Sequence, residues 1–125
     1  MSESTSQQAV IQWFGYACHQ LGVPDARLLY AIPNGAFYGN DRRASIIRSA
    51  RMKREGLLPG VPDLFLAVAR NHYHGLYVEM KKGKGRTSPA QVEVHTMLIK
   101  QGYACATAHS TDEAMSIISG YCTER

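Results

Sequence analysis

Two acidic residues and a lysine stand at a spacing that could hold a divalent cation against a phosphodiester. Asp63 follows Pro62, and after fifteen intervening residues Glu79 and Lys81 form a Glu-x-Lys sequence. Hard cations such as Mg²⁺ prefer oxygen ligands, which the two carboxylates and the Met80 carbonyl could supply. A bound cation would polarise the phosphate and lower the pKa of a water. Lys81 could orient or deprotonate that water, or stabilise the developing negative charge. The pattern therefore indicates metal-dependent hydrolysis of a phosphodiester.

Each of these side chains also has a purely structural interpretation. Asp63 could cap a turn after Pro62, and Glu79 and Lys81 could form a solvated edge pair that contributes little to stability. Pro-Asp and Glu-x-Lys both arise often by chance. The sequence around them therefore has to decide between the two interpretations.

The segments around the acids predict a β-hairpin that would bring them together. The apolar runs at 64–69 and 75–78 are typical of strands, and five residues separate them. We therefore expect them to pair antiparallel, with Asp63 opposite the stretch from Glu79 to Lys81. Because strand side chains alternate between faces, Glu79 and Lys81 should project to the same face of the sheet.

The basic residues are clustered in two segments that flank the proposed site. Ten of the fourteen lysines and arginines lie there, which is typical of proteins whose affinity comes from contacts to phosphates. A solvated helix face is the alternative for the first segment. Asn34, in the preceding loop, could also contact DNA or simply form a turn. We predict DNA contacts from Arg42, Arg43, Arg48, Arg51, Lys53 and Arg54 in the first segment, and from Lys82, Lys84 and Arg86 in the second.

Further motifs accompany the acids and the lysine along the chain. They are Ile32-Pro33-Asn34-Gly35, the run from Arg54-Glu55-Gly56 into Gly60-Val61-Pro62-Asp63-Leu64, the strand His74-Gly75-Leu76-Tyr77-Val78-Glu79-Met80-Lys81, and Ser88-Pro89-Ala90-Gln91. In this order the set resembles the VRR-NUC family of the PD-(D/E)xK nuclease superfamily, in its small standalone form common in phages and prophages. The resemblance spans residues 3 to about 121, and the combination is far more specific than any single motif.

The resemblance implies a role for each residue of the site. Asp63 and Glu79 match the metal-binding acids, Lys81 matches the catalytic lysine, and Gln91 matches a glutamine near the active site. Glu3 is similar to an upstream acid that supports the metal site. The cofactor that the resemblance implies is Mg²⁺ or Mn²⁺.

Two of these residues also have local structural roles. Glu3 would be a favourable negative charge near a helix N-terminus. Ser88-x-x-Gln91, with Pro89 at the first helical position, is a capping box. The capping role and the active-site role of Gln91 do not exclude each other.

Length and composition favour a small globular enzyme. At 125 residues the chain fits a single domain, 1–125, and its hydrophobic content of 45% is ordinary. The polar N-terminus and the lack of a long apolar run predict a cytoplasmic protein with no membrane partner. The resemblance implies a bacterial host and a phage or prophage origin. Three cysteines without a Cys-x-x-Cys pair indicate reduced thiols. No P-loop or Gly-x-Gly-x-x-Gly sequence is present, so we expect no nucleotide cofactor.

The hydrophobic pattern predicts an α/β fold with the order αβαββαβα. The resemblance likewise implies a restriction-endonuclease-like mixed β-sheet flanked by helices. In chain order we expect a helix capped by Ser4 or Ser6 and ending at Gly22, a strand at 28–32, a helix at 42–55, the hairpin with its turn near Asn71 or His72, a helix at 88–101, a strand at 103–108, and a last helix capped by Thr111.

These observations predict a divalent-metal-dependent DNA endonuclease. The resemblance to standalone family members implies a structure-specific homodimer similar to Holliday-junction resolvases, acting on branched or four-way-junction DNA. The sequence itself indicates no preference for branched DNA and shows no dimer interface, although apolar faces on the terminal helices are candidates for one. Two alternatives stay open: a restriction-type enzyme that cuts a specific duplex sequence, and a DNA-binding module with a silent nuclease site. A purely structural α/β domain would leave both basic clusters unexplained.

Overall fold

The computed structural model describes residues 2–33 and 42–123. In chain order the elements are α1 (Glu3–Ala17), the 3₁₀ turn η1 (Ala26–Leu28), β1 (Leu29–Ala31), α2 (Arg42–Arg54), β2 (Leu64–Leu66), β3 (Leu76–Met80), α3 (Pro89–Lys100), β4 (Ala104–Ala108) and α4 (Thr111–Thr123). This order confirms the predicted α/β fold. None of the described helices is long and apolar enough to cross a membrane.

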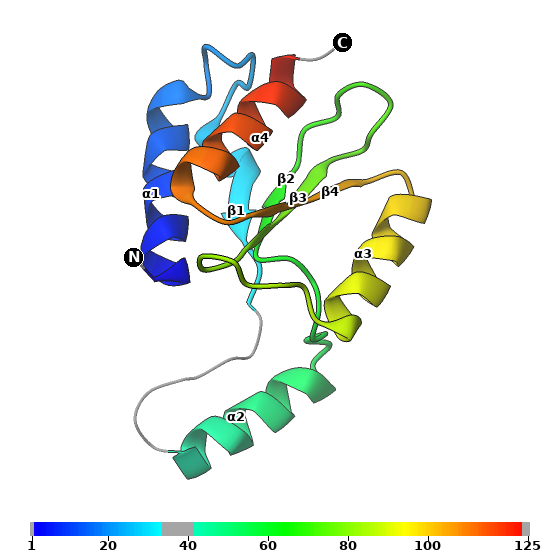
Figure 1. The fold of residues 1–125 in the computed structure, drawn as a ribbon. Helices are drawn as coiled ribbons and strands as arrows, with labels where there is room; N and C mark the ends of the chain where they lie inside the picture. The colour runs from blue at the N-terminus through cyan, green and yellow to red at the C-terminus, as the bar shows by residue number, and fades with distance from the viewer. Residues whose placement is uncertain (1, 34–41, 124–125) are drawn as a thin grey trace.

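The four strands form one mixed sheet in the order β1-β2-β3-β4. The first two pairings are antiparallel, and β3 pairs with β4 in parallel. A parallel pair needs a crossover connection, which α3 supplies. Figure 1 shows α1 and α4 side by side, α3 beside β4 on the opposite side of the sheet, and α2 apart from these layers. The acids of the hairpin therefore lie on a sheet that helices hold from both sides.

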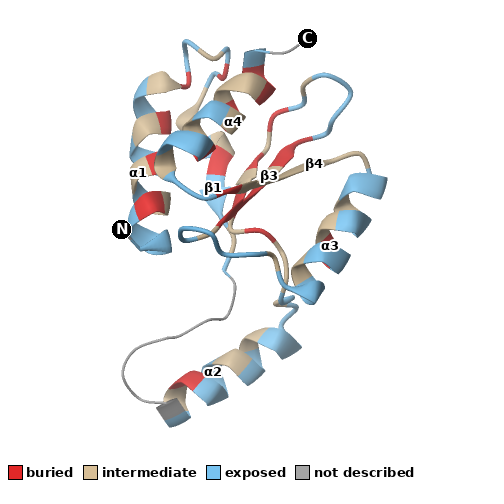
Figure 2. Ribbon diagram, in the orientation of Figure 1, coloured by how far each residue is buried: buried red, intermediate tan, exposed pale blue. Residues whose placement is uncertain are grey.

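The main core lies between the sheet and the pair α1 and α4. Leu64 and Leu66 of β2, and Leu76, Val78 and Met80 of β3, are each at most 2% exposed. They alternate along their strands, as expected when one face of a sheet is buried. The helices contribute Val10, Phe14, Ala114 and Ile118. Figure 2 shows the buried residues concentrated between α1, α4 and the strands, which makes β2 and β3 a rigid base for the site.

The hairpin turn is centred on Asn71 and His72, as predicted. Both residues have positive φ, 46° and 70°. Around them the backbones of Arg70 and Tyr73 exchange hydrogen bonds of 3.2 and 2.8 Å. Two successive left-handed residues give a turn whose twist matches the strands on either side. The turn therefore sets the register that decides which residue lies opposite Asp63.

β2 is shorter than predicted, covering Leu64–Leu66 rather than 64–69. The Val68 carbonyl accepts a hydrogen bond from the Tyr121 hydroxyl of α4 at 2.6 Å. This carbonyl therefore pairs with the last helix and not with a neighbouring strand. The Arg70 side chain donates to the Cys122 carbonyl at 3.3 Å. Contacts to the last helix therefore take this stretch out of the sheet.

The first helix differs from the prediction at both ends. Ser2 caps it, with its hydroxyl accepting a first-turn backbone N–H at 3.0 Å. Ser4 and Ser6 lie inside the helix, where their backbone cannot take the extended conformation of a cap. The helix ends at Ala17 instead of Gly22, because short-range backbone hydrogen bonds close a turn at residues 18–23.

Candidate active site

Asp63 and Glu79 meet at the end of the sheet where β2 begins and β3 ends. Leu64 lies opposite Val78, so the next position outward sets Asp63 opposite Glu79. The Oδ2 atom of Asp63 accepts a hydrogen bond from the Met80 backbone N–H at 2.8 Å. This bond ties the Asp63 carboxylate to β3, and the hairpin thereby brings the two acids together.

Glu79 is a buried carboxyl in contact with both neighbouring elements. It is 3% exposed, and its Oε1 accepts a 2.5 Å hydrogen bond from Gln91 Nε2. Burial, followed by the hydrogen bond and the charge of Asp63, raises the pKa of Glu79 to about 9, while the charge of Lys81 lowers it. Two carboxyls this close do not both ionise readily without a cation. The metal-free pair therefore retains a proton at neutral pH.

Gln91 combines the capping role and the contact to the acids. Its Oε1 accepts from the Ser88 backbone N–H at 2.8 Å, and its backbone N–H donates to Ser88 Oγ at 3.2 Å. These two bonds are the predicted capping box at the start of α3. The amide nitrogen stays available for Glu79 because an amide has separate donor and acceptor atoms. The cap therefore orients the group that holds Glu79.

Glu3 lies near the end of β3 but does not pair with the two acids. Its Oε2 accepts from the Lys82 backbone N–H at 3.2 Å. Its negative charge makes a small contribution to the raised pKa of Glu79. Glu3 is also the acidic residue in the first turn of α1, where a negative charge is favourable. Both of the interpretations made from the sequence are thus compatible with its position.

Lys81 continues the strand ladder one residue beyond β3. Its backbone N–H donates to the Ala108 carbonyl at 2.8 Å. Alternation along the strand then directs its side chain to the same face as Glu79. Because the Lys81 charge lowers the pKa of Glu79, the ammonium acts on the carboxyl pair electrostatically.

His95 borders this site and carries no sequence motif that identifies it. It lies one turn after Gln91 on α3, and its Nε2 is buried without a hydrogen-bond partner among the described residues. Burial and then the charge of Lys81 lower the pKa of His95, which favours the neutral imidazole. The four-residue spacing from Gln91 was the one signal that it shares a helix face with that residue.

The oxygen atoms of the site suit a hard divalent cation. Asp63 and Glu79 offer carboxylates, and the Met80 carbonyl directly follows Glu79 at the end of β3. Within the described residues no three His, Cys, Asp or Glu side chains gather at one point. A site with two carboxylates leaves coordination positions for water, which Mg²⁺ retains in most protein sites. The donor set therefore fits Mg²⁺ or Mn²⁺.

The basic residues form two exposed groups at different distances from the acids. The second group borders them directly because it follows β3, whereas Figure 1 shows α2 set apart, beyond the end of the sheet where β2 begins. The side chain of Arg42 and the whole of Asn34 lie outside the described residues. The exposed side chains are Arg43, Arg48, Arg51, Lys53 and Arg54 on α2, and Lys82, Lys84 and Arg86 after β3.

Comparison with known proteins agrees with this arrangement. The sequence model of the VRR-NUC domain family matches residues 3–112. A solved structure described as a VRR_NUC domain protein is 31% identical in sequence, with a TM-score of 0.78, and the match covers 99% of this chain and 92% of that chain. Among curated proteins none matches the chain. The chain belongs to the VRR-NUC domain family, a family of PD-(D/E)xK nucleases.

Proposed function

We propose that this protein is a divalent-metal-dependent endonuclease that hydrolyses phosphodiester bonds in DNA. The strongest support is the pair formed by Asp63 and the buried Glu79, whose pKa is raised to about 9 chiefly by burial and then by the neighbouring Asp63. Held by Asp63, Glu79 and the Met80 carbonyl, Mg²⁺ or Mn²⁺ would polarise the scissile phosphate and acidify a bound water.

The chain's own residues would position the substrate and the water. Gln91 fixes one oxygen of Glu79, and the Met80 N–H fixes one oxygen of Asp63, so both carboxyl groups are held in place at the end of the sheet. The Lys81 ammonium would orient the attacking water or stabilise the charge that develops on the phosphate. Glu3 would support the metal site through water from its place beside Lys82.

The exposed cations after β3 would hold the DNA strand. Lys82, Lys84 and Arg86 directly follow the strand that carries Glu79 and Lys81. Each phosphate that a cation neutralises releases counterions, so these contacts add affinity without reading the base sequence. The cations of α2 would extend this surface to more distant phosphates.

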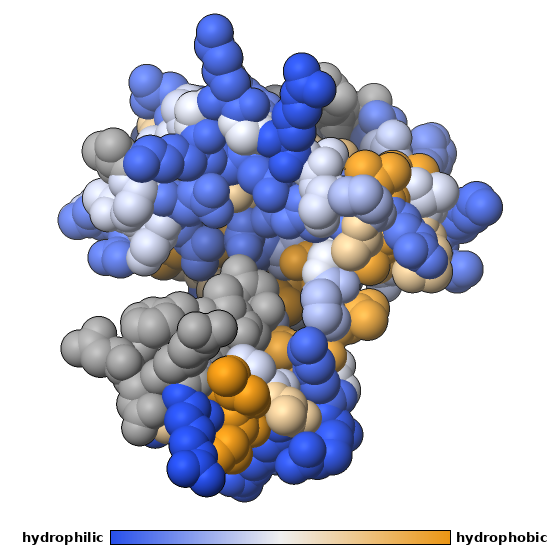
Figure 3. All heavy atoms as spheres, turned by 60° about the horizontal axis from the view of Figure 1, so that its bottom comes forward, coloured by the Kyte–Doolittle hydropathy of each residue, from blue (hydrophilic) through white to orange (hydrophobic). Residues whose placement is uncertain are grey.

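We further propose that the enzyme works as a homodimer on branched DNA such as a four-way junction. Ile46 and Ile47 of α2 are 60% and 58% exposed. Figure 3 shows hydrophobic side chains gathered on α2 among hydrophilic ones. A second copy that covered this patch would remove it from water, and a two-fold dimer would present two active sites to two strands. Light scattering should give twice the mass of the chain, and an Ile46→Asp/Ile47→Asp variant should be monomeric.

A cleavage assay with four DNA structures tests the function. Linear duplex, single-stranded, flap and four-way-junction DNA are each incubated with Mg²⁺, Mn²⁺ or EDTA. We expect cleavage that needs the metal and stops in Glu79→Ala, whereas Glu93→Ala, which changes an exposed glutamate on α3, stays active. Cleavage in EDTA, or a fully active Glu79→Ala, would refute the assignment.

The same assay separates the alternatives. Symmetric cutting confined to the junction supports the dimeric structure-specific enzyme. Cutting of linear duplex at one sequence indicates a restriction-type enzyme. Binding to DNA without cleavage under any metal condition indicates a module whose nuclease site is silent.

A further inference from the structure

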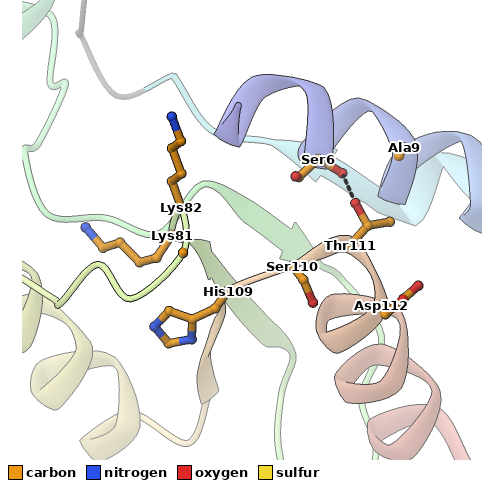
Figure 4. Close-up of a pocket in the computed structure, with 9 residues that line it drawn as sticks. Ser6, Ala9, Lys81, Lys82, His109, Ser110, Thr111 and Asp112 are labelled. Atoms are coloured by element: carbon orange, nitrogen blue, oxygen red, sulfur yellow. Dashed lines mark hydrogen bonds between the residues drawn. The ribbon is translucent and has the colours of Figure 1, made fainter. Parts of the chain in front are cut away.

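A cavity of about 640 Å³ opens beyond the end of β3, where Lys81 and Lys82 follow the strand. Its walls come from one turn of α1, from residues 81–83 and from residues 109–112, as Figure 4 shows. Lys81 lines the cavity and its charge also acts on Glu79, so the cavity adjoins the proposed active site. A volume of this size is in the range of small-ligand sites and exceeds what a lone phosphate needs.

Strand alternation directs the side chains of the two lysines that line the cavity to different sides of β3. Lys81 and Lys82 follow each other at the end of β3, so their side chains leave the strand in opposite directions. Figure 4 shows the two side chains diverging, with Lys82 extending beside α1. A DNA strand that crosses the end of β3 at Lys81 would therefore meet the Lys82 side next.

The wall opposite the lysines also favours an anion. His109 Nε2 lies 3.0 Å from the Gly85 carbonyl, and Nδ1 lies 3.4 Å from Glu113 Oε1. These two contacts hold the His109 ring in place at the cavity wall. Ser110, rather than the predicted Thr111, caps α4 by accepting from the Glu113 N–H at 3.0 Å. The start of this 13-residue helix therefore faces the cavity and adds partial positive charge.

The remaining lining decides what the cavity could recognise. Asp112 is the single acid among the nine lining residues, and in Figure 4 its carboxylate points away from the two lysines. Apart from His109, the lining includes no ring on which a base could stack. Base recognition by stacking normally needs aromatic side chains, so this chemistry suits the sugar-phosphate backbone.

We propose that this cavity binds the DNA backbone next to the scissile phosphate, with Lys82 contacting the flanking phosphodiester. The inference rests on the proposed nuclease function. The carboxyl pair and Lys81 act on one phosphate, while Lys82 and the start of α4 hold the neighbouring one. Because the contact is to a phosphate, it positions the strand for cleavage and does not select a sequence.

Binding to backbone-modified DNA tests this assignment. The DNA that the wild type cuts best is prepared with a single uncharged methylphosphonate at each position around the cut. Binding of each modified DNA is measured in EDTA with three full-length proteins. The first is the Glu79→Gln variant, called the parent, and the other two carry Lys82→Ala or Lys100→Ala in addition. Lys100 is exposed on α3, outside the cavity lining, so its substitution controls for the change in net charge.

We expect the parent to bind more weakly when the methylphosphonate replaces one particular phosphate beside the cut. In Lys82→Ala, the methylphosphonate at that position should no longer weaken binding, while its effect at the other positions should be unchanged. Lys82→Ala should also reduce the slope of log Kd against log salt concentration by about one. Lys100→Ala should keep the pattern of the parent. Unchanged sensitivity and slope in Lys82→Ala would overturn the inference while leaving the nuclease proposal standing. A wild type that cuts no DNA, or a parent that binds none, would overturn both.

Discussion

Replacing Glu79 by glutamine should stabilise the metal-free protein at neutral pH, although the same change should abolish cleavage. The pKa of Glu79 rises from 4.5 to about 9 on folding, chiefly because the side chain is buried and secondly because Asp63 lies beside it. Glutamine has the shape of the protonated carboxyl. It can still accept from Gln91 and can donate to Asp63 without a charge.

The pH dependence gives the magnitude. Between pH 4.5 and about 9 the folded protein holds a proton on Glu79 that the unfolded chain releases. The free energy of unfolding of the wild type therefore falls as pH rises, by about 1.4 kcal/mol per pH unit from this group. By pH 7 the loss is about 3 kcal/mol. Above pH 9 the folded carboxyl also ionises, and this contribution stops changing.

Urea unfolding in EDTA from about pH 5 to about pH 8 measures this effect. The stability difference between Glu79→Gln and the wild type should widen by about 4 kcal/mol over that interval. Glu93→Gln, at an exposed position of α3, should follow the wild type throughout. If the free energy of unfolding changed with pH in the same way for the wild type and Glu79→Gln, the reasoning would be refuted. That result would require an ionised Glu79 in the folded metal-free protein.

Three further outcomes are expected. Mg²⁺ should raise the melting temperature of the wild type more at about pH 8 than at about pH 6, because the cation favours the ionised carboxyls, and equal shifts at both pH values would contradict this. Ser88→Ala should cost about 1 kcal/mol in a urea unfolding assay and leave cleavage intact, whereas Gln91→Ala should also slow cleavage about 10-fold or more. Gly60→Ala should cost about 1 to 3 kcal/mol by thermal melting, because φ is 98° and the new Cβ would lie 2.7 Å from the Ala90 carbonyl oxygen. Gly15→Ala is the matched control, because a Cβ added at this position of α1 would meet nothing within 4 Å. This substitution should raise the free energy of unfolding by about 0.5 to 1 kcal/mol.

The local features of the site could be predicted from the sequence. The spacing from Asp63 to Glu79 and the turn at Asn71 and His72 set the hairpin register. The Ser88-to-Gln91 spacing specified the capping box. These depend on strand alternation and on turn and helix-cap chemistry over a few residues, so they follow from sequence order.

Other features depend on segments that are distant in the sequence. β2 was shorter because the Tyr121 hydroxyl, from α4, takes the Val68 carbonyl. His95 reaches the site only through the packing of α3 on the sheet. No local sequence pattern predicts contacts of this kind.

The sequence by itself determined the residue types of the site, their order and the family to which the chain belongs. Tertiary structure decided the charge state of Glu79 and the existence of the cavity beside Lys82. The pKa of a carboxyl depends on its removal from water and on the charges that packing brings near it. A cavity depends on which helices meet, here α1 and α4 from opposite ends of the chain. Both are properties of the packed fold and not of the spacing between residues.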